Sequence, residues 1–303
     1  MSELIELGLR FFDRYRYLII DAGRREEIPK SWAAAPIAPA FLKDDTARCP
    51  LLVDTAVIPN ASLDTILNPA ALNTAVLLDR LATETAAGEE TLASLALASA
   101  KPFSQLQMHL TRRLQIQPAH NQPRRQFRYF DPGTFIQLPD VLGAAGFSWL
   151  LGPIDAVAVP WLGQWCTYAN PGDAGALHFR LEHHIDALQA LSVVNRVLTQ
   201  LPGLRDQQDW RDKGAATRTL VAHAQAAYGL DQRDDLVAFA LHAWQWHPAF
   251  DRHPILQKLL AELAAAAPED ELDYRELTAR LDESDWQKIV RDLQTTTPQG
   301  NPR

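Results

Sequence analysis

The sequence has few of the residues that mark metal clusters, disulfide frameworks and membrane spans. Its 303 residues include only two cysteines, Cys49 and Cys166, and neither belongs to a CxxC pair. Two distant cysteines argue against a disulfide framework or a zinc cluster and suit a reducing compartment. Charge, proline or glycine interrupts every apolar stretch well before about 18 residues, so we expect no transmembrane helix and no membrane partner.

The motifs of several common enzyme classes are also missing. The chain contains no GxGxxG, no phosphate-binding loop and no HExxH, and Ser148 lacks the second glycine of a nucleophile elbow. We therefore expect no enzymatic activity, no cofactor and no resident metal. Residues 1–12 carry Glu3, Glu6 and Arg10 among their apolar residues, so we expect no export signal and a cytoplasmic protein.

The charge balance argues against nucleic acid as a partner. Lysine and arginine total 29, aspartate and glutamate total 37, and the formal net charge is −8. An acidic chain repels phosphate backbones. The apolar fraction of 47% and the charged fraction of 22% are typical of a globular protein.

The first half of the chain predicts an α/β N-terminal lobe, a mixed sheet with flanking helices. Residues 17–20 and 51–53 are apolar runs that end in carboxylates, Asp21 and Asp54, which is typical of a strand entering a loop. Residues 92–99 and the aromatic residues 126–131 predict further strands, and a helix is expected to begin at Pro102.

The second half predicts an all-α C-terminal lobe. Apolar residues recur every three or four positions over 181–201, and further helical patterns follow to residue 293. The clearest linker is the glycine-rich stretch 171–175. We expect an α/β lobe over residues 1–170, a helical lobe over 176–294 and a disordered tail over 295–303.

A histidine cluster suggests one alternative function. His178 and Glu182 are four residues apart and would share one face of a helix, with His183 and His184 beside them. A metal-dependent hydrolase could use His178, Glu182 and His184. A third ligand at suitable spacing is missing, so a solvated helix surface is the favoured interpretation.

A basic run suggests a second alternative, a binder of single-stranded nucleic acid. Aromatic residues interleave with arginines, as in a stacking platform with phosphate clamps. The overall acidity favours arginines paired with carboxylates instead. The residues are Arg112, Arg113, Arg124, Arg125, Phe127, Arg128, Tyr129 and Phe130.

The stretch from Phe127 to Pro132, FRYFDP, is the most informative in the chain. Asp131 before Pro132 predicts a helix N-cap followed by proline at the first helical position. Arg128 is expected to pair with Asp21 or Asp54, which end two other apolar runs. This arrangement predicts a rigid polar structural motif at the edge of a sheet.

Four blocks of the sequence together resemble the type VI secretion effector adaptor (chaperone) family. The similarity covers roughly residues 15–165, and the helical remainder is similar to the variable C-terminal lobe of many members. Family members usually carry arginine after the Asp-Pro, where this chain has Gly133. The blocks are YLIIDA at 17–22, PLLV at 50–53, residues 104–114 with HLTRRL, and FRYFDP at 127–132.

The resemblance implies a non-enzymatic cytoplasmic adaptor. Such proteins bind a toxin effector, often near its N-terminal region or its Pro-Ala-Ala-Arg-repeat tip domain, and load it onto the valine-glycine-repeat spike. Because ligands favour domain junctions and aromatics are enriched in binding hot spots, we expect the partner to bind aromatic residues near the linker. These candidates are Trp161, Trp165, Tyr168 and Phe179.

Overall fold

The computed structural model describes residues 2–8, 10–58, 74–117, 122–266 and 272–296. The chain divides into two units. The first comprises Met1–Asp186 and Arg205–Trp210, and the second comprises Ala187–Leu204 and Arg211–Arg303. An α/β unit followed by a helical one confirms the predicted fold class. The division falls after Asp186 rather than at residues 171–175, and residues 297–303 of the predicted tail lie outside the described residues.

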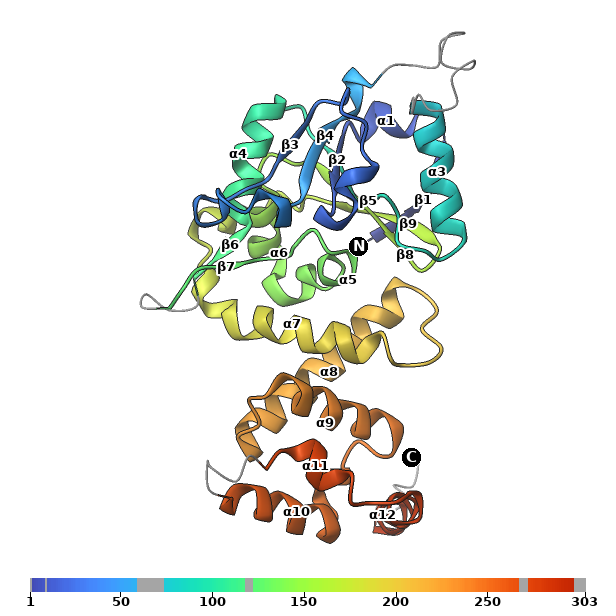
Figure 1. The fold of residues 1–303 in the computed structure, drawn as a ribbon, viewed down its shortest axis with the longest axis vertical. Helices are drawn as coiled ribbons and strands as arrows, with labels where there is room; N and C mark the ends of the chain where they lie inside the picture. Colours follow the sequence, from blue (N-terminus) through green and yellow to red (C-terminus); the bar gives the residue numbers. More distant parts are fainter. Residues whose placement is uncertain (1, 9, 59–73, 118–121, 267–271, 297–303) are drawn as a thin grey trace. The chain divides into compact units, whose positions relative to one another are not determined.

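The described part of the first unit contains a seven-stranded sheet (Figure 1). Every strand pair in it is antiparallel, where the sequence predicted a mixed sheet. Continuous apolar strands indicate a sheet covered on both faces, but they carry no information on strand direction. In spatial order the strands are β1 (Ser2–Ile5), β9 (Gln164–Ala169), β8 (Ala156–Trp161), β5 (Ala93–Ala98), β2 (Tyr17–Ile20), β4 (Leu51–Asp54) and β3 (Ala34–Pro36).

Helices cover both faces of this sheet. Leu18 and Ile20 of β2 belong to one core cluster with Leu77 of α3 (Thr74–Ala86). Ile19 faces the other way, and with Leu110 of α4 (Phe103–Arg113) it lines a small internal cavity that α6 (Leu138–Leu151) also borders. All residues of β2, β4 and β5 are buried, which explains their uninterrupted apolar sequences.

Short elements connect these layers. Pro102 is the N-cap of α4 rather than its first residue. The predicted aromatic strand ends at Gln126, because the backbone of residues 127–131 closes local turn hydrogen bonds instead. The elements are α1 (Phe11–Arg14), η1 (Ala22–Glu27), η2 (Ala40–Leu42), η3 (Thr46–Arg48), η4 (Thr55–Val57), β6 (Gln115–Ile116), β7 (Arg125–Gln126), α5 (Pro132–Phe135), η5 (Ala174–His178) and η6 (Leu181–His184).

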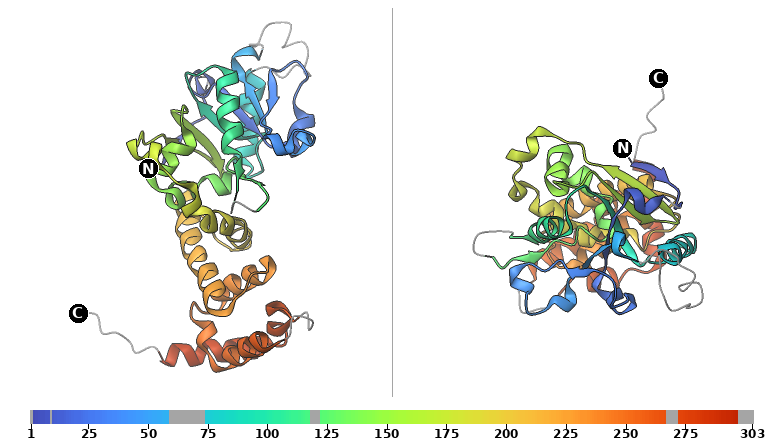
Figure 2. Two further views of the ribbon diagram at one scale, coloured as in Figure 1. Left: turned by 90° about the vertical axis from the view of Figure 1, so that its left-hand side faces the viewer. Right: turned by 90° about the horizontal axis from the view of Figure 1, so that it is seen from above.

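The second unit is helical, and Figure 2 shows its orange to red helices in two further views. Phe239, Phe250, Tyr274 and Trp286 are buried together there. The predicted helix over 181–201 begins with η6 and continues as α7. The first two residues of α7 and the first four of α8 belong to the first unit, and the rest of the helices to the second. The helices are α7 (Ile185–Leu198), α8 (Gln207–Tyr228), α9 (Arg233–Gln245), η7 (Phe250–Arg252), α10 (Pro254–Ala265), α11 (Tyr274–Thr278) and α12 (Glu283–Thr296).

Two helix ends in this unit differ in how they are closed. Gly229 follows α8 with φ of 66°, the left-handed conformation in which glycine commonly ends a helix. α9 begins after Gln232, which makes no side-chain hydrogen bond to the first turn. None of the helices in the described ranges is long and apolar enough to cross a membrane.

Candidate functional site

The FRYFDP block packs against the C-terminal end of α4. The Phe127 N–H donates to Leu114 O at 2.7 Å, and the Tyr129 hydroxyl donates to Leu110 O at 3.2 Å. Phe127, Tyr129 and Phe130 are all buried, with neighbouring rings edge to face. Their faces are therefore not open to stacking bases, which removes the platform that the nucleic-acid hypothesis requires.

Asp131 and Pro132 form the predicted helix start. Asp131 is the N-cap of α5, and its Oδ1 accepts a hydrogen bond from the Thr134 N–H at 2.9 Å. Pro132 occupies the first helical position, where its missing N–H costs nothing. The local sequence alone therefore predicts this geometry correctly.

Arg128 pairs with Asp21, one of its two predicted partners. Arg128 Nη2 lies 3.2 Å from Asp21 Oδ2, and the two side chains are 56% and 36% exposed. Asp21 also accepts from the Gly23 N–H at 2.8 Å and so caps η1. The pair joins the FRYFDP block to the end of β2, but its exposure makes it weaker than a buried ion pair.

Asp54 repeats this arrangement with a different arginine. Arg16 donates to both of its carboxylate oxygens, at 2.8 Å and 2.6 Å. Asp54 Oδ1 also accepts from the Ala56 N–H at 3.0 Å and caps η4. The Asp54 side chain is only 6% exposed, so this bidentate pair is the better shielded of the two.

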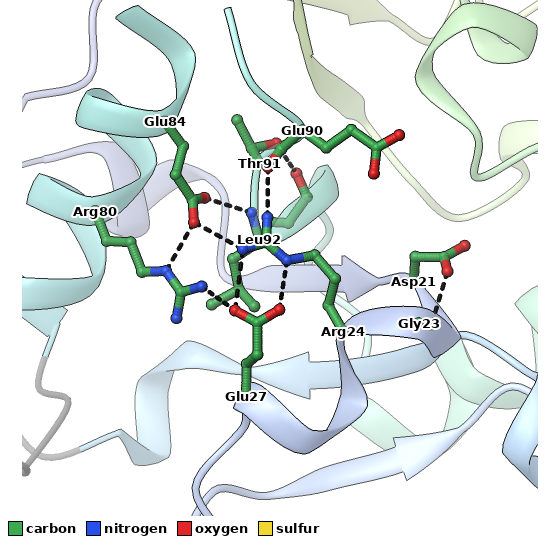
Figure 3. Close-up of polar contacts among 10 residues, drawn as sticks. Asp21, Gly23, Arg24, Glu27, Arg80, Glu84, Glu90, Thr91 and Leu92 are labelled. Atoms are coloured by element: carbon green, nitrogen blue, oxygen red, sulfur yellow. Dashed lines mark hydrogen bonds and ion pairs between the residues drawn. The ribbon is translucent and has the colours of Figure 1, made fainter. Parts of the chain in front are cut away.

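A network of four charged side chains includes Arg24 and Glu27 of η1, the short helix that Asp21 caps (Figure 3). Arg24 contacts Glu27 at 2.8 Å and Glu84 at 2.9 Å, and Arg80 contacts the same two carboxylates. Hydrogen bonds from Arg24 and Arg80 lower the pKa of Glu27 to about 2. Glu84 also accepts from the Leu92 N–H at 2.6 Å, so the network ties η1 and α3 to the start of β5. The sequence did not indicate this network, because no local pattern relates the Arg24–Glu27 pair to the distant Arg80–Glu84 pair.

Two of the four predicted partner-binding aromatics are buried in the first unit. Trp165 is 2% exposed, lies 5.3 Å from the Phe11 ring and donates its indole N–H to Thr85 Oγ1 at 2.8 Å. Tyr168 is 3% exposed and donates to Gln207 Oε1 at 2.6 Å. Neither side chain offers surface to a partner, so both are corrected to core residues.

Trp161 is half-buried and packs beside Gly133, the position where members of the adaptor family usually carry arginine. Its ring lies edge to face with Trp210 at 4.6 Å, and the Trp210 indole N–H donates to Gly133 O at 2.9 Å. A Cβ at Gly133 would lie 3.0 Å from the Trp210 ring and 3.2 Å from the Trp161 ring. Two tryptophans therefore fill the space that a side chain at position 133 would enter.

Phe179 is half-buried within a row of side chains whose rings contact one another. Its ring centroid lies 5.2 Å from that of Trp149 and 5.0 Å from that of His184. On the Trp149 ring, the Arg113 guanidinium carbon lies 3.8 Å from the centroid. We refer to Arg113, Trp149, Phe179 and His184 as the arginine–aromatic row. Trp149 was not singled out from the sequence, and Arg113 was noted only in the basic run and in the block of residues 104–114.

The histidine cluster does not share a helix face. His178 ends η5 and Glu182 lies in η6, and Phe179 and Arg180 between them are extended. His184 Nδ1 donates to Val141 O at 2.9 Å. Within the described ranges, no group of three His, Cys, Asp or Glu side chains is placed to hold a metal ion.

The basic run is divided among different surroundings. Arg113 belongs to the arginine–aromatic row and Arg128 pairs with Asp21, whereas Arg124 and Arg125 are exposed. The arginines therefore do not form one continuous clamp.

Comparison with protein-family models gave no match. Searches of curated proteins and of solved structures gave no match either. The resemblance to effector adaptors therefore rests on the four sequence blocks alone.

Proposed function

We propose that this chain is a cytoplasmic adaptor that binds a type VI secretion toxin effector and loads it onto the valine-glycine-repeat spike, without catalysing a reaction. One observation carries the proposal. The four blocks that resemble the adaptor family form a single connected element of the first unit.

Direct contacts join each block to another. β2 and β4 pair in register, with Ile20 opposite Leu51. The Arg128–Asp21 pair joins the FRYFDP block to the end of β2, and the Tyr129–Leu110 hydrogen bond joins it to α4. The four blocks therefore form one contiguous part of the first unit, as a shared folded element would require.

The arginine–aromatic row is the best supported surface for the effector. Phe179 and Trp161 are the predicted aromatics that keep partial exposure, and Trp161 is packed against Trp210. Half-buried aromatic side chains anchor protein partners because they bury a large area at a small entropic cost. Phe179, held between Trp149 and His184, fits that role.

Coexpression with a toxin and a spike protein tests the proposal. We expect the chain to co-elute with the toxin in size-exclusion chromatography, and the spike to join that complex. Phe179→Ala should weaken toxin capture about fivefold or more, equivalent to about 1 kcal/mol. Phe41→Ala is the matched control, since Phe41 is an exposed phenylalanine of η2 in the same unit.

The outcomes separate the function from its surface. If the chain captures neither toxin nor spike, the adaptor proposal is wrong. If capture occurs but the Phe41 and Phe179 variants behave alike, the adaptor function stands and the binding surface lies elsewhere.

A further inference from the structure

The positive charge of Arg113 has no carboxylate partner among the residues that the structure describes. Its guanidinium stacks on Trp149, and its Nε–H is buried without an acceptor. In the part of the chain that the structure describes, Arg113 forms neither an ion pair nor a hydrogen bond. By contrast, Arg16, Arg24 and Arg128 of the same unit each contact a carboxylate.

This environment is unfavourable for a cation. The side chain is half-buried, and a desolvated charge without a partner is costly. Burial and the neighbouring charge of Arg112 lower the pKa of Arg113 to about 10, so the group remains charged at neutral pH. Stacking on an indole offsets part of this cost but leaves the edge of the guanidinium unpaired.

We propose that the arginine–aromatic row binds an acidic segment of a partner protein, with a carboxylate on the free edge of Arg113 and an apolar side chain beside Phe179. The inference rests on the proposed function only for the source of that segment. A planar guanidinium stacked through its face still presents N–H donors that match a carboxylate.

The surroundings favour a segment with acidic and apolar residues together. Arg112 is exposed and adds a second positive charge beside Arg113. Leu177, two residues before Phe179, is 87% exposed and supplies apolar surface. Arg112 and Arg113 contact no carboxylate in the described ranges, so in a chain of net charge −8 they are complementary to an acidic peptide.

Nucleic acid fits this surface less well. Arg113 covers one face of Trp149, and Phe179 stacks on His184, so bases would have to displace these contacts. Non-specific binding of a phosphate backbone also needs a longer series of cations than Arg112 and Arg113 provide.

Calorimetry on the full purified chain tests the inference with three probes: hexaglutamate, its uncharged counterpart hexaglutamine, and a short oligothymidylate. We expect hexaglutamate to bind more tightly than the other two, with an affinity that falls as salt rises. Arg113→Gln should weaken hexaglutamate binding about tenfold. Arg124→Gln is the matched control, because Arg124 is an exposed arginine of the same basic run.

A second variant keeps the test independent of folding. Arg113→Lys retains the positive charge but loses the planar guanidinium and its paired N–H donors. This variant should therefore also bind hexaglutamate more weakly than the unaltered chain. Thermal melting establishes that each variant is folded.

Three results would overturn the inference. These are equal binding of hexaglutamate and hexaglutamine, equal losses in the Arg113 and Arg124 variants, and tighter binding of oligothymidylate through Arg113. Hexaglutamate binding that depends on Arg113, in a chain that captures no toxin, would reject the adaptor function alone. Toxin capture without hexaglutamate binding would reject this inference alone.

Discussion

Asp21 and Asp54 provide a matched test of how burial sets the strength of an ion pair in this fold. Each ends an apolar strand segment, and each accepts a hydrogen bond from the backbone N–H two residues later. The Asp54 side chain is 6% exposed and accepts two hydrogen bonds from Arg16. The Asp21 side chain is 36% exposed and contacts Arg128 at 3.2 Å.

The substitutions Asp54→Asn and Asp21→Asn remove the charge and keep a side chain that can cap. A hydrogen bond to a charged group contributes about 1.5–3 kcal/mol. Arg16 is 47% exposed, so water can solvate it once its partner is lost. The free energy of unfolding should therefore fall by less at Asp54 than it does when a fully buried pair is broken, which costs about 3–5 kcal/mol. We expect Asp54→Asn to lower the free energy of unfolding by about 2–3 kcal/mol, and Asp21→Asn by less than about 1 kcal/mol.

Native-state hydrogen exchange at the β2 amides is the appropriate assay, because a chain of two units need not unfold in one transition. The exchange free energies of β2 report the first unit directly. Equal losses in the two variants, or a larger loss for Asp21→Asn, would refute the argument that burial determines the strength of these pairs.

Three further predictions follow from local geometry. Asp131→Ala should lower stability by about 0.5–2 kcal/mol through the lost cap, and Arg128→Ala by less than about 1 kcal/mol; thermal melts that rank them in the opposite order would contradict this. Gly133→Arg should displace the Trp210 ring and lower the melting temperature, and an unchanged melt and tryptophan spectrum would disprove that packing. Burial lowers the pKa of His242 from 6.5 to about 4, so the unfolded chain binds a proton more readily than the folded one. The stability linked to neutral His242 is therefore fully present above about pH 6.5 and is lost as the pH falls toward 4. Urea titrations at several pH values should show this fall in the free energy of unfolding. The fall should be smaller in the His242→Gln variant.

The sequence predicts features that depend on neighbouring residues. Asp131 lies three residues before its donor, the Thr134 N–H, so the local sequence determines this cap. The change from short apolar runs to a 3.6-residue period predicts the α/β unit followed by helices. The Arg128–Asp21 pair was also anticipated, because charged side chains near strand ends have few partners available.

Features that arise from tertiary packing were not predictable in this way. The aromatics of FRYFDP alternate as in a strand, yet local turn hydrogen bonds place Phe127, Tyr129 and Phe130 all in the interior. The contact between Arg24 and Glu84 joins residues 60 positions apart, and no sequence period relates them. Arg113 reaches Trp149 only because α4 packs against α6, so the most distinctive surface of the first unit becomes visible only in the fold.

Toxin delivery tests the adaptor proposal most directly. In cells that use a type VI secretion system and encode this chain, deleting the chain should abolish release of one toxin, while the tube protein of the secretion machinery still reaches the medium. Restoring the chain should restore that toxin, and Phe179→Ala should restore it only partly. Unchanged release of every toxin after deletion, or loss of the tube protein together with the toxins, would contradict the account.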